Sequence, residues 1–350
     1  MVSKKRGIVL MNLGSPDSTE VKDVRRYLNE FLMDERVIDV SYLLRLLLVR
    51  GIISPFRAPK SAEAYRSIWT KEGSPLIVLS RQLKDALQQL VEEPVVIAMR
   101  YGNPSPKTAF DELLSKSREI DEVILVPLYP HYAMSSYETA VEYAKQIHRQ
   151  YKYSFSLTIV PPFYDDVGYI SALAESIKPY LAQEYDHLLF SYHGVPERHI
   201  HKTDPTRSHC LKSADCCSVH SSAHQFCYRH QCMETTSKVA AMLNIPGNKY
   251  SMSFQSRLGR DEWLKPYTAV RLEQMPKEGI KKLLVVCPAF ISDCLETLEE
   301  IAEEGKELFM HAGGESFTMI PCLNVQPAWV ATLKKWLHEY KTGNRTMLTS

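Results

Sequence analysis

The stretch HLLFSYHGVPER, His187 to Arg198, carries the residues that decide the fold. Its apolar run, residues 188–192, ends at a histidine and is followed by Gly194 and Pro196, a pattern typical of a buried strand that stops at a turn. In an open parallel sheet, the carboxyl end of a strand faces the ligand crevice. His193 stands at such an end, and imidazole moves protons near neutral pH. Taken alone, the stretch fits equally well a histidine that only hydrogen-bonds within a loop.

The composition is ordinary for a soluble globular protein. The chain has 350 residues, of which 45% are hydrophobic and 24% are charged, with a net charge of +1. This length is typical of two domains, and the absence of a basic block argues against a nucleic-acid partner. The basic start and the apolar residues 7–13 superficially resemble a signal peptide, but Gly14-Ser15-Pro16 ends the run early, so we predict a first strand there.

An apolar segment over residues 40–56 is interrupted by Arg45 and Arg50. It is too short and too charged to span a membrane. The segment could lie on a membrane surface or line an apolar pocket, and the plainer alternative is a buried helix.

Strand-like and helix-like runs alternate along the chain. We predict strands over residues 7–13, 95–101, 123–129, 155–160, 188–192, 250–254, 283–286 and 317–320. We predict the main helices over residues 17–31, 61–69, 75–90, 108–116, 135–151, 232–243, 295–309 and 327–341. Such alternation with short connections predicts the α/β class, with a doubly wound parallel sheet in each half. No G-x-G-x-x-G follows the first strand, which disfavours a dinucleotide enzyme.

The two halves look like a diverged duplication. IVLMNLGSP (residues 8–16) matches LLFSYHGVP (residues 188–196) in pattern, and SSYET (135–139) matches DCLET (293–297). The alternative is chance similarity between strand-to-helix turns, which favour Gly and Pro. A true duplication predicts two similar domains whose strand ends share one cleft, where a ligand would bind.

An acidic stretch, ISDCLETLEEIAEEGKEL, follows a predicted strand over residues 291–308. Two rows of glutamates, each spaced four residues apart, follow on the helix: Glu296, Glu300 and Glu304, then Glu299, Glu303 and Glu307. Residues four apart share a helix face. We interpret the second row as a solvated face. Glu296 stands next to the strand end, so a metal or proton role is predicted for it.

The motifs together resemble the ferrochelatase family, lyases that insert ferrous iron into a porphyrin. They are NLGSPDS (12–18), KEGSPL (71–76), RYGNPS (100–105), PLYPHYAMSS (127–136), SYHGVPER (191–198), FQSRLGRDEWLKPYT (254–268) and CPAFISDCLETLEEI (287–301). The resemblance covers residues 7 to 337 and implies the chelatase fold, with two Rossmann-like domains and a porphyrin cleft between them. The predicted boundaries are residues 1–160, including an apolar lip at 40–60, then 161–324, including a cysteine segment at 205–232, and a C-terminal helix at 325–350 that packs back on the first domain.

The resemblance also implies the site residues. His193 and Glu296 match the catalytic residues that meet the Fe²⁺ substrate, Asp293 matches an acidic residue beside them, and Glu300 lies on a candidate iron route. Trp263 also offers a flat face to an aromatic ligand. The positions that match the porphyrin pocket or its lip are Leu13, Arg57, Tyr65, Ser74, Arg100, Tyr101, Tyr132 and Trp263. Cys294 departs from the histidine of many members, so a metal-ligand role there is in doubt.

Five of the eight cysteines lie within residues 210–232. Without a secretory signal, a local cysteine cluster is more typical of metal binding than of disulfides. The segment resembles an insertion that binds a [2Fe–2S] cluster in a subclass of bacterial ferrochelatases. The predicted ligands are Cys210, Cys217, Cys227 and Cys232, with Cys216 as the substitute for Cys217. A structural zinc site that uses nearby histidines (His209, His220, His224 and His230) is the alternative, and free thiols are a third.

The predicted function is insertion of Fe²⁺ into protoporphyrin IX or coproporphyrin III, the terminal stage of haem biosynthesis. His193 would accept a pyrrole proton or, in the opposite assignment, bind iron. The alternatives are a chelatase for another metal and tetrapyrrole, and a porphyrin or haem carrier without turnover. The apolar lip favours the less charged protoporphyrin. The expected location is cytoplasmic, with peripheral contact at the inner membrane or with the preceding pathway enzyme, as a monomer or a homodimer.

Overall fold

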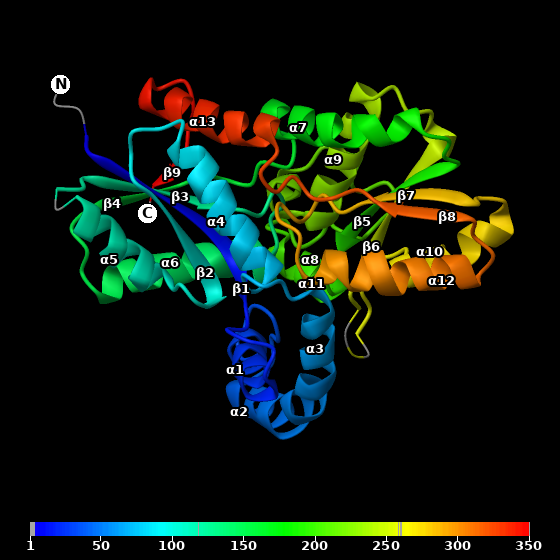
Figure 1. Ribbon diagram of the computed structural model, residues 1–350, viewed down its shortest axis with the longest axis horizontal. Helices are drawn as coiled ribbons and strands as arrows, with labels where there is room; N and C mark the ends of the chain where they lie inside the picture. The colour runs from blue at the N-terminus through cyan, green and yellow to red at the C-terminus, as the bar shows by residue number, and fades with distance from the viewer. Residues whose placement is uncertain (1–3, 118, 258, 260, 350) are drawn as a thin grey trace. The chain divides into compact units, whose positions relative to one another are not determined.

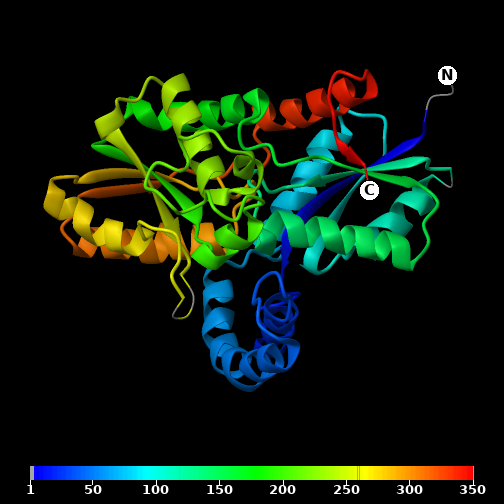
Figure 2. The ribbon, with the colours of Figure 1, turned by 180° about the vertical axis from the view of Figure 1, so that it is seen from behind.

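The computed structural model describes residues 4–117, 119–257, 259 and 261–349, and it divides into two compact units. Unit 1 comprises the described residues of 1–128, 134–161 and 333–350, and unit 2 comprises those of 129–133 and 162–332. Figures 1 and 2 draw them from opposite sides. Each unit has a parallel sheet flanked by helices, which confirms the predicted α/β class.

The sheet of unit 1 has the order β2-β1-β3-β4-β9 in the described chain. Its strands are β1 (Arg6–Ser15), β2 (Val95–Gly102), β3 (Glu122–Pro127), β4 (Ser156–Ile159) and β9 (Leu348–Thr349). The first four are parallel, and β9 pairs antiparallel with β4. Residues 8–11 of β1 are all completely buried, as expected for a central strand covered on both faces.

The sheet of unit 2 has the order β6-β5-β7-β8, all parallel. Its strands are β5 (His187–His193), β6 (Tyr250–Gln255), β7 (Lys282–Val286) and β8 (Ser316–Met319). In chain order within each unit, both sheets place their first four strands as 2-1-3-4. The duplication hypothesis predicts this shared order, and the matched motifs IVLMNLGSP and LLFSYHGVP include equivalent strands, β1 and β5.

Helices connect the strands in both units. Those of unit 1 are α1 (Val21–Leu32), α2 (Tyr42–Leu46), η1 (Leu47–Ile53), α3 (Ser54–Ile68), α4 (Pro75–Gln88), α5 (Pro106–Lys116), η2 (Met134–Glu138) and α6 (Thr139–Gln150). Those of unit 2 are α7 (Val167–Ile177), η3 (Lys178–Ala182), α8 (Glu197–Thr203), η4 (Ser222–Phe226), α9 (Tyr228–Met242), η5 (Gly247–Lys249), α10 (Thr268–Gln274), η6 (Met275–Glu278), α11 (Leu295–Leu298), η7 (Glu300–Gly305) and α12 (Lys306–His311). Helix α13 (Pro327–Lys341) begins in unit 2 and ends in unit 1. In the described chain, no helix has the length and apolar character needed to cross a bilayer.

The lip differs from a buried helix. Helices α1, α2 and α3 project from the sheet of unit 1 (Figure 1), and η1 joins α2 to α3 as a π-helix. Large apolar side chains remain open along this segment: Leu43 is 72% exposed, Leu47 69% and Phe56 80%. The alternative of a plain buried helix over residues 40–56 is therefore wrong.

The prediction of one regular helix over residues 295–309 is wrong for the middle of that range. The chain forms α11, then the π-helical η7, then α12. A π-helix has a longer turn than an α-helix, so glutamates four apart do not stay in one row. Glu304 is exposed beside Glu303, whereas Glu300 is partly buried.

Helix α7 lies outside every predicted helix, although Asp166 caps it by accepting hydrogen bonds from the backbone N–H groups of Gly168 and Tyr169.

Candidate active site

His193 is the last residue of β5, as predicted. Its Nδ1 lies 2.6 Å from the Gly194 carbonyl oxygen. Because a carbonyl only accepts, Nδ1 carries the proton, so in the neutral imidazole the lone pair is on Nε2. The Tyr228 hydroxyl donates to the His193 carbonyl at 2.9 Å. The ring lies beside Trp263 and Phe290, with centroids 6.5 and 6.3 Å away.

A carboxyl group, Glu300 of η7, stands close enough to interact with both His193 and Glu296. Burial raises the pKa of Glu300, and the negative charge of Glu296 adds to the rise, whereas donors from Ser256 and the charge of His193 oppose it. The backbone N–H and the hydroxyl of Ser256 donate to its two oxygens at 2.7 and 2.5 Å. Ser256 has a φ of 66°, in the left-handed region that non-glycine residues rarely adopt. This strained turn aims both of its donors at Glu300.

Gln255, the last residue of β6, connects the strand that carries His193 to the helix that carries Glu296. Its Nε2 donates to the Glu296 carbonyl at 2.7 Å, and its Oε1 accepts from the Ser191 hydroxyl of β5 at 2.7 Å. The side chain is only 3% exposed. Sequence reasoning did not select Gln255 or Ser256 as site residues. The sequence feature that could have indicated them is their position at the end of a strand, directly before a glycine-containing loop.

Asp293 is buried, and its carboxylate accepts hydrogen bonds from three other protein groups. Its carboxylate accepts from the Asn324 amide at 2.6 Å, the Thr297 hydroxyl at 3.0 Å and the Cys322 N–H at 3.3 Å. Cys294 is the N-cap of α11, where its side chain and that of Thr297 form a reciprocal capping box. These contacts fix the loop that delivers Glu296 to the end of the sheet.

Tyr132 lies in unit 2, beside the cysteine segment. Its N–H donates to Gln231 Oε1 at 2.7 Å, and its ring meets Phe226 edge-on at 5.2 Å. Trp263 is 9% exposed and pairs with Pro196 through an isolated backbone bridge. In unit 2 the ring of Trp263 therefore lies next to that of His193, and its role in a porphyrin pocket stays a prediction.

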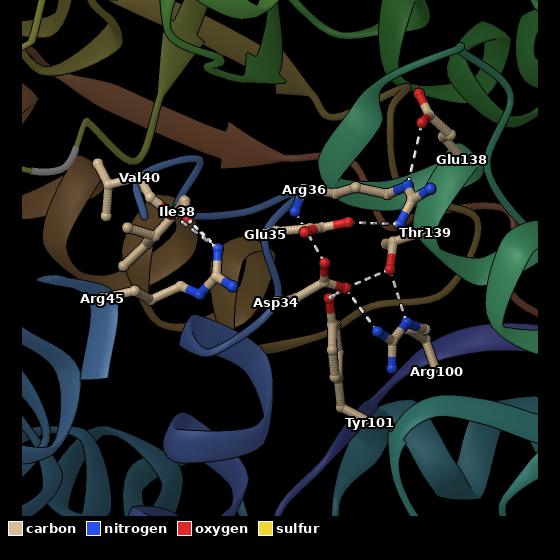
Figure 3. Close-up of polar contacts among 10 residues, drawn as sticks. All are labelled: Asp34, Glu35, Arg36, Ile38, Val40, Arg45, Arg100, Tyr101, Glu138 and Thr139. Carbon is tan, nitrogen blue, oxygen red and sulfur yellow. Dashed lines mark hydrogen bonds and ion pairs between the residues drawn. The ribbon is translucent and has the colours of Figure 1, made fainter. Parts of the chain in front are cut away.

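Arg100 and Tyr101 end β2 in unit 1 and hold Asp34 (Figure 3). The Asp34 carboxylate accepts from the Arg100 guanidinium at 2.5 Å, from the Tyr101 hydroxyl at 2.8 Å and from the Thr139 hydroxyl. Burial would raise the pKa of Asp34, but the Thr139 hydroxyl and the other donors outweigh it and lower the pKa. Tyr101 is completely buried. Both side chains thus anchor the loop that leads from α1 into the lip.

The same loop is held at two further points (Figure 3). Arg36 donates to Glu138 at 3.0 Å, and buried Arg45 donates to the carbonyls of Ile38 and Val40. Arg45, one of the two arginines that interrupt the apolar segment, therefore stabilises the turn before α2.

The remaining predicted pocket residues of unit 1 differ in exposure. Arg57 is exposed on α3, and Leu13 is partly exposed at the end of β1. Ser74 is buried at the N-cap of α4. Tyr65 is buried with its ring edge-on to Tyr27 and Trp69.

The thiols of the cysteine segment are buried and close together. Cys227 hydrogen-bonds Cys210 and Cys217 through their side chains, and the Cys216 and Cys217 sulfurs are 4.0 Å apart. The Arg229 guanidinium lies 3.5 Å from both of those sulfurs. Burial raises the pKa of Cys210 to about 11. Among the described residues, no set of three or more His, Cys, Asp or Glu side chains is arranged around a single metal position.

Asp204 and three histidines shape this segment. The Asp204 carboxylate accepts from the N–H groups of His209 and Cys210 at 3.0 and 2.9 Å. His209 and His224 donate to the Cys216 carbonyl, and His230 donates to the Cys217 carbonyl. The histidines therefore support the backbone of the cysteine pair.

Burial raises the pKa of Cys232, and the charge of the nearby Cys217 adds to the rise. Cys232 is completely buried in α9 and hydrogen-bonds the Tyr228 side chain. Tyr228 in turn donates to the His193 carbonyl. A direct chain of contacts thus leads from the end of the cysteine segment to the strand that carries His193.

A model of the ferrochelatase family matches residues 5–341. The chain belongs to the ferrochelatase family. It is 50% identical over 328 residues to a ferrochelatase of Pseudomonas fluorescens (strain Pf0-1), covering 93% of this chain and 95% of the relative. A ferrochelatase of Opitutus terrae is 50% identical over 339 residues, covering 95% of this chain and 98% of the relative. The family resemblance of the motifs is thereby confirmed.

Solved structures confirm the fold of this ferrochelatase. SirB from Bacillus subtilis, solved with Fe³⁺, matches with a TM-score of 0.52 at 13% identity, covering 97% of this chain and 96% of SirB. A cobalt complex of the sirohydrochlorin chelatase SirB from Bacillus subtilis subspecies spizizenii gives the same TM-score and coverage at 11% identity. At such low identity, the match establishes the chelatase fold alone.

Proposed function

We propose that this ferrochelatase inserts Fe²⁺ into protoporphyrin IX, at the terminal stage of haem biosynthesis, with coproporphyrin III as the alternative substrate. The observation that carries this proposal is the meeting of His193 with Glu300 and Glu296 at the strand ends of unit 2. Imidazole and carboxylate ligands bind ferrous iron without the retention that thiolates would impose. The same groups accept protons.

His193 accepts a pyrrole proton. Its Nδ1–H is committed to the Gly194 carbonyl, so the free lone pair on Nε2 is the acceptor. Imidazole is the side chain best suited to exchanging protons near neutral pH. The opposite assignment, in which His193 binds iron, uses the same lone pair. The hydrogen bond from Tyr228 to the His193 carbonyl holds the strand end in place for either role.

Glu296 and Glu300 guide the iron substrate or carry away the second proton. Burial raises the pKa of Glu300, which brings this carboxyl closer to the pH at which it exchanges protons with its surroundings. Asp293 is bonded to three protein groups, so we assign it a positioning role for Glu296 rather than contact with iron.

The lip makes peripheral contact with a membrane. The exposed side chains of Leu43, Leu47 and Phe56 support this proposal, because contiguous exposed apolar surface is typical of an interaction site. An apolar contact also suits delivery of protoporphyrin, the less charged of the two candidate porphyrins.

A [2Fe–2S] cluster is bound by the cysteine segment. Four linked thiols fit the donor set of such a cluster, which takes four thiolates: Cys227 contacts Cys210 and Cys217, and Cys217 contacts Cys216. The sequence predicts Cys232 as the fourth ligand and Cys216 only in place of Cys217; we propose Cys216 as the fourth ligand instead, because its sulfur lies 4.0 Å from that of Cys217. Zinc is the alternative occupant. When bound, such a cluster supplies a redox-active, structure-organising group, and Arg229 places a positive charge beside two of its sulfurs.

The cysteine segment is coupled to His193 through Tyr228. Its hydroxyl lies between the Cys232 thiol and the His193 carbonyl. Loss of order in the segment would therefore release the strand end. Spectroscopy separates the ligand assignments: Cys216→Ser should remove visible iron–sulfur absorption and acid-labile sulfide, and Cys232→Ser should retain both. The opposite result would restore Cys232 as the ligand.

Iron insertion measured with both porphyrins tests the activity. His193→Ala and Glu296→Ala should abolish insertion while circular dichroism remains native, and near-normal turnover in either variant would sink the assignment. Glu303→Ala is the matched control, because Glu303 is an exposed residue in the same acidic stretch. Tight porphyrin binding without metalated product would favour a carrier, and faster insertion of cobalt or nickel into another tetrapyrrole would favour the other chelatase.

A further inference from the structure

A cationic hollow of about 730 Å³ lies in unit 1 beside α1. It shares only Arg100 with the predicted porphyrin-pocket residues. Five cations line it against two carboxylates, Glu30 and Asp34, so the lining carries a net charge of +3. The cations are Lys22, Arg25, Arg26, Arg50 and Arg100.

The hollow is built on one face of an amphipathic helix. Lys22, Arg25 and Arg26 are exposed on α1, whereas Val24 and Leu28 are buried. Residues three and four apart share a helix face. A charged outer face alone would be an ordinary solvated surface. Here Arg50 of η1 and Arg100 of β2 join it from other elements.

Among the described residues, three of the five cations form no ion pair. Arg26 pairs with Asp17, and Arg100 pairs with Asp34. Within the part of the chain that the structure describes, no carboxylate forms an ion pair with Lys22, Arg25 or Arg50. Like charges gathered in a concave surface focus a positive potential, which attracts an anion from solution.

The lip, which contains Arg50, carries the most exposed large apolar side chains among the described residues of unit 1. Arg50 lies in η1 together with Leu47, which is 69% exposed, and Ile52, which is 57% exposed. Exposed apolar side chains next to unpaired cations are the combination by which proteins bind anionic membrane surfaces. A soluble anion would account for the cations but not for their apolar neighbours.

We propose that the hollow binds the headgroup phosphate of an anionic phospholipid while the apolar side chains of the lip enter the acyl region. This inference rests on the proposed peripheral membrane contact and adds to it a preference for anionic lipid. Each cation near an anionic surface contributes on the order of a fivefold gain in affinity. Three unpaired cations therefore predict a preference on the order of 10²-fold, which high salt would weaken.

Vesicle flotation of the full-length protein tests the proposal. The probes are phosphatidylcholine vesicles with and without phosphatidylglycerol. The cation variant is Lys22→Gln/Arg25→Gln/Arg50→Gln. The matched control, Arg81→Gln/Arg149→Gln/Lys334→Gln, makes the same charge change at exposed cations of unit 1 outside the hollow. A third variant, Leu43→Ser/Leu47→Ser/Phe56→Ser, removes the apolar contact.

The wild type and the control should prefer phosphatidylglycerol vesicles, and the cation variant should bind both vesicles equally. The apolar variant should lose binding to both. Detergent-solubilised insertion activity should be unchanged in the cation variant, which shows that it is folded. Equal binding of both vesicles by the wild type overturns the anionic preference, and an equal loss in the control overturns its assignment to the hollow. In both cases the peripheral contact stands. A wild type that binds neither vesicle overturns the peripheral contact itself.

Discussion

Replacing Gln255 with methionine should disconnect the two halves of the active site without creating a large cavity. The substitution keeps the length of the side chain but removes its donor and its acceptor. The Glu296 carbonyl and the Ser191 hydroxyl each lose a partner at 2.7 Å. Ser191 also contacts Thr268 at 3.0 Å, so the larger loss falls on the Glu296 end.

The magnitude follows from these contacts. Two lost hydrogen bonds cost about 1 kcal/mol each, and an incompletely satisfied carbonyl adds about 1 kcal/mol. The expected loss is therefore about 2–3 kcal/mol in the free energy of unfolding. Because Gln255 positions the first turn of α11, Glu296 should also shift, and a displacement near 1 Å costs on the order of 10²-fold in rate. The loss should appear in kcat rather than in KM, because the aromatic residues predicted to line the porphyrin pocket are untouched.

Urea unfolding and steady-state iron insertion measure the two effects. Gln88→Met is the matched control, because Gln88 also makes side-chain bonds at both ends, with Val95 N–H and the carbonyls of Val91 and Glu93, but lies in unit 1. It should destabilise the protein and leave kcat unchanged. If Gln255→Met retains kcat within about twofold of wild type while losing stability, Gln255 is structural only and the reasoning is refuted.

Three further predictions follow from single contacts. Tyr228→Phe should lower kcat and speed loss of the cluster absorption, because its hydroxyl joins the cysteine segment to His193; unchanged cluster lifetime would contradict the coupling. Asp34→Asn should destabilise the protein by about 2 kcal/mol, since charge-assisted bonds to buried donors are lost; thermal unfolding measures this. Burial lowers the pKa of His131 to about 3 and that of His187 to about 4. Below about pH 6.5 the unfolded chain therefore binds more protons than the folded protein does. The urea midpoint of unfolding should decrease as the pH is lowered from about 7 to about 5.

The strand ends could be predicted from the sequence because local signals mark them. Short strand-like runs, most of them ending at Gly or Pro, located the parallel strands of both units within a few residues, including His193 at the end of β5. The proline at the start of α4 and the capping residue of α5 act in the same local way. These features depend on neighbours in the chain, so periodicity and turn chemistry are sufficient to find them.

The connections inside the site could not be predicted in this way. Nothing in the chain indicates that Gln255 meets a carbonyl 41 residues later, at Glu296. The π-helical turn of η7 was also hidden, because the glutamate spacing fits a regular α-helix. The turn leaves Glu300 partly buried beside Ser256 and exposes Glu304. Tertiary contacts decided both outcomes against the local pattern.

Gly14 and Gly194 occupy equivalent positions at the strand ends of the two units. A side chain at Gly14 would place its Cβ 1.8 Å from the Tyr101 carbonyl oxygen, and one at Gly194 would lie 2.8 Å from the Gln255 carbonyl oxygen. Both strands thus need glycine where they press against the end of the neighbouring strand. The residue before the glycine is free to differ, and it is Leu13 in unit 1 but His193 in unit 2. The common backbone therefore presents an apolar side chain at one strand end and an imidazole at the other, which supports placing the proposed proton acceptor in unit 2.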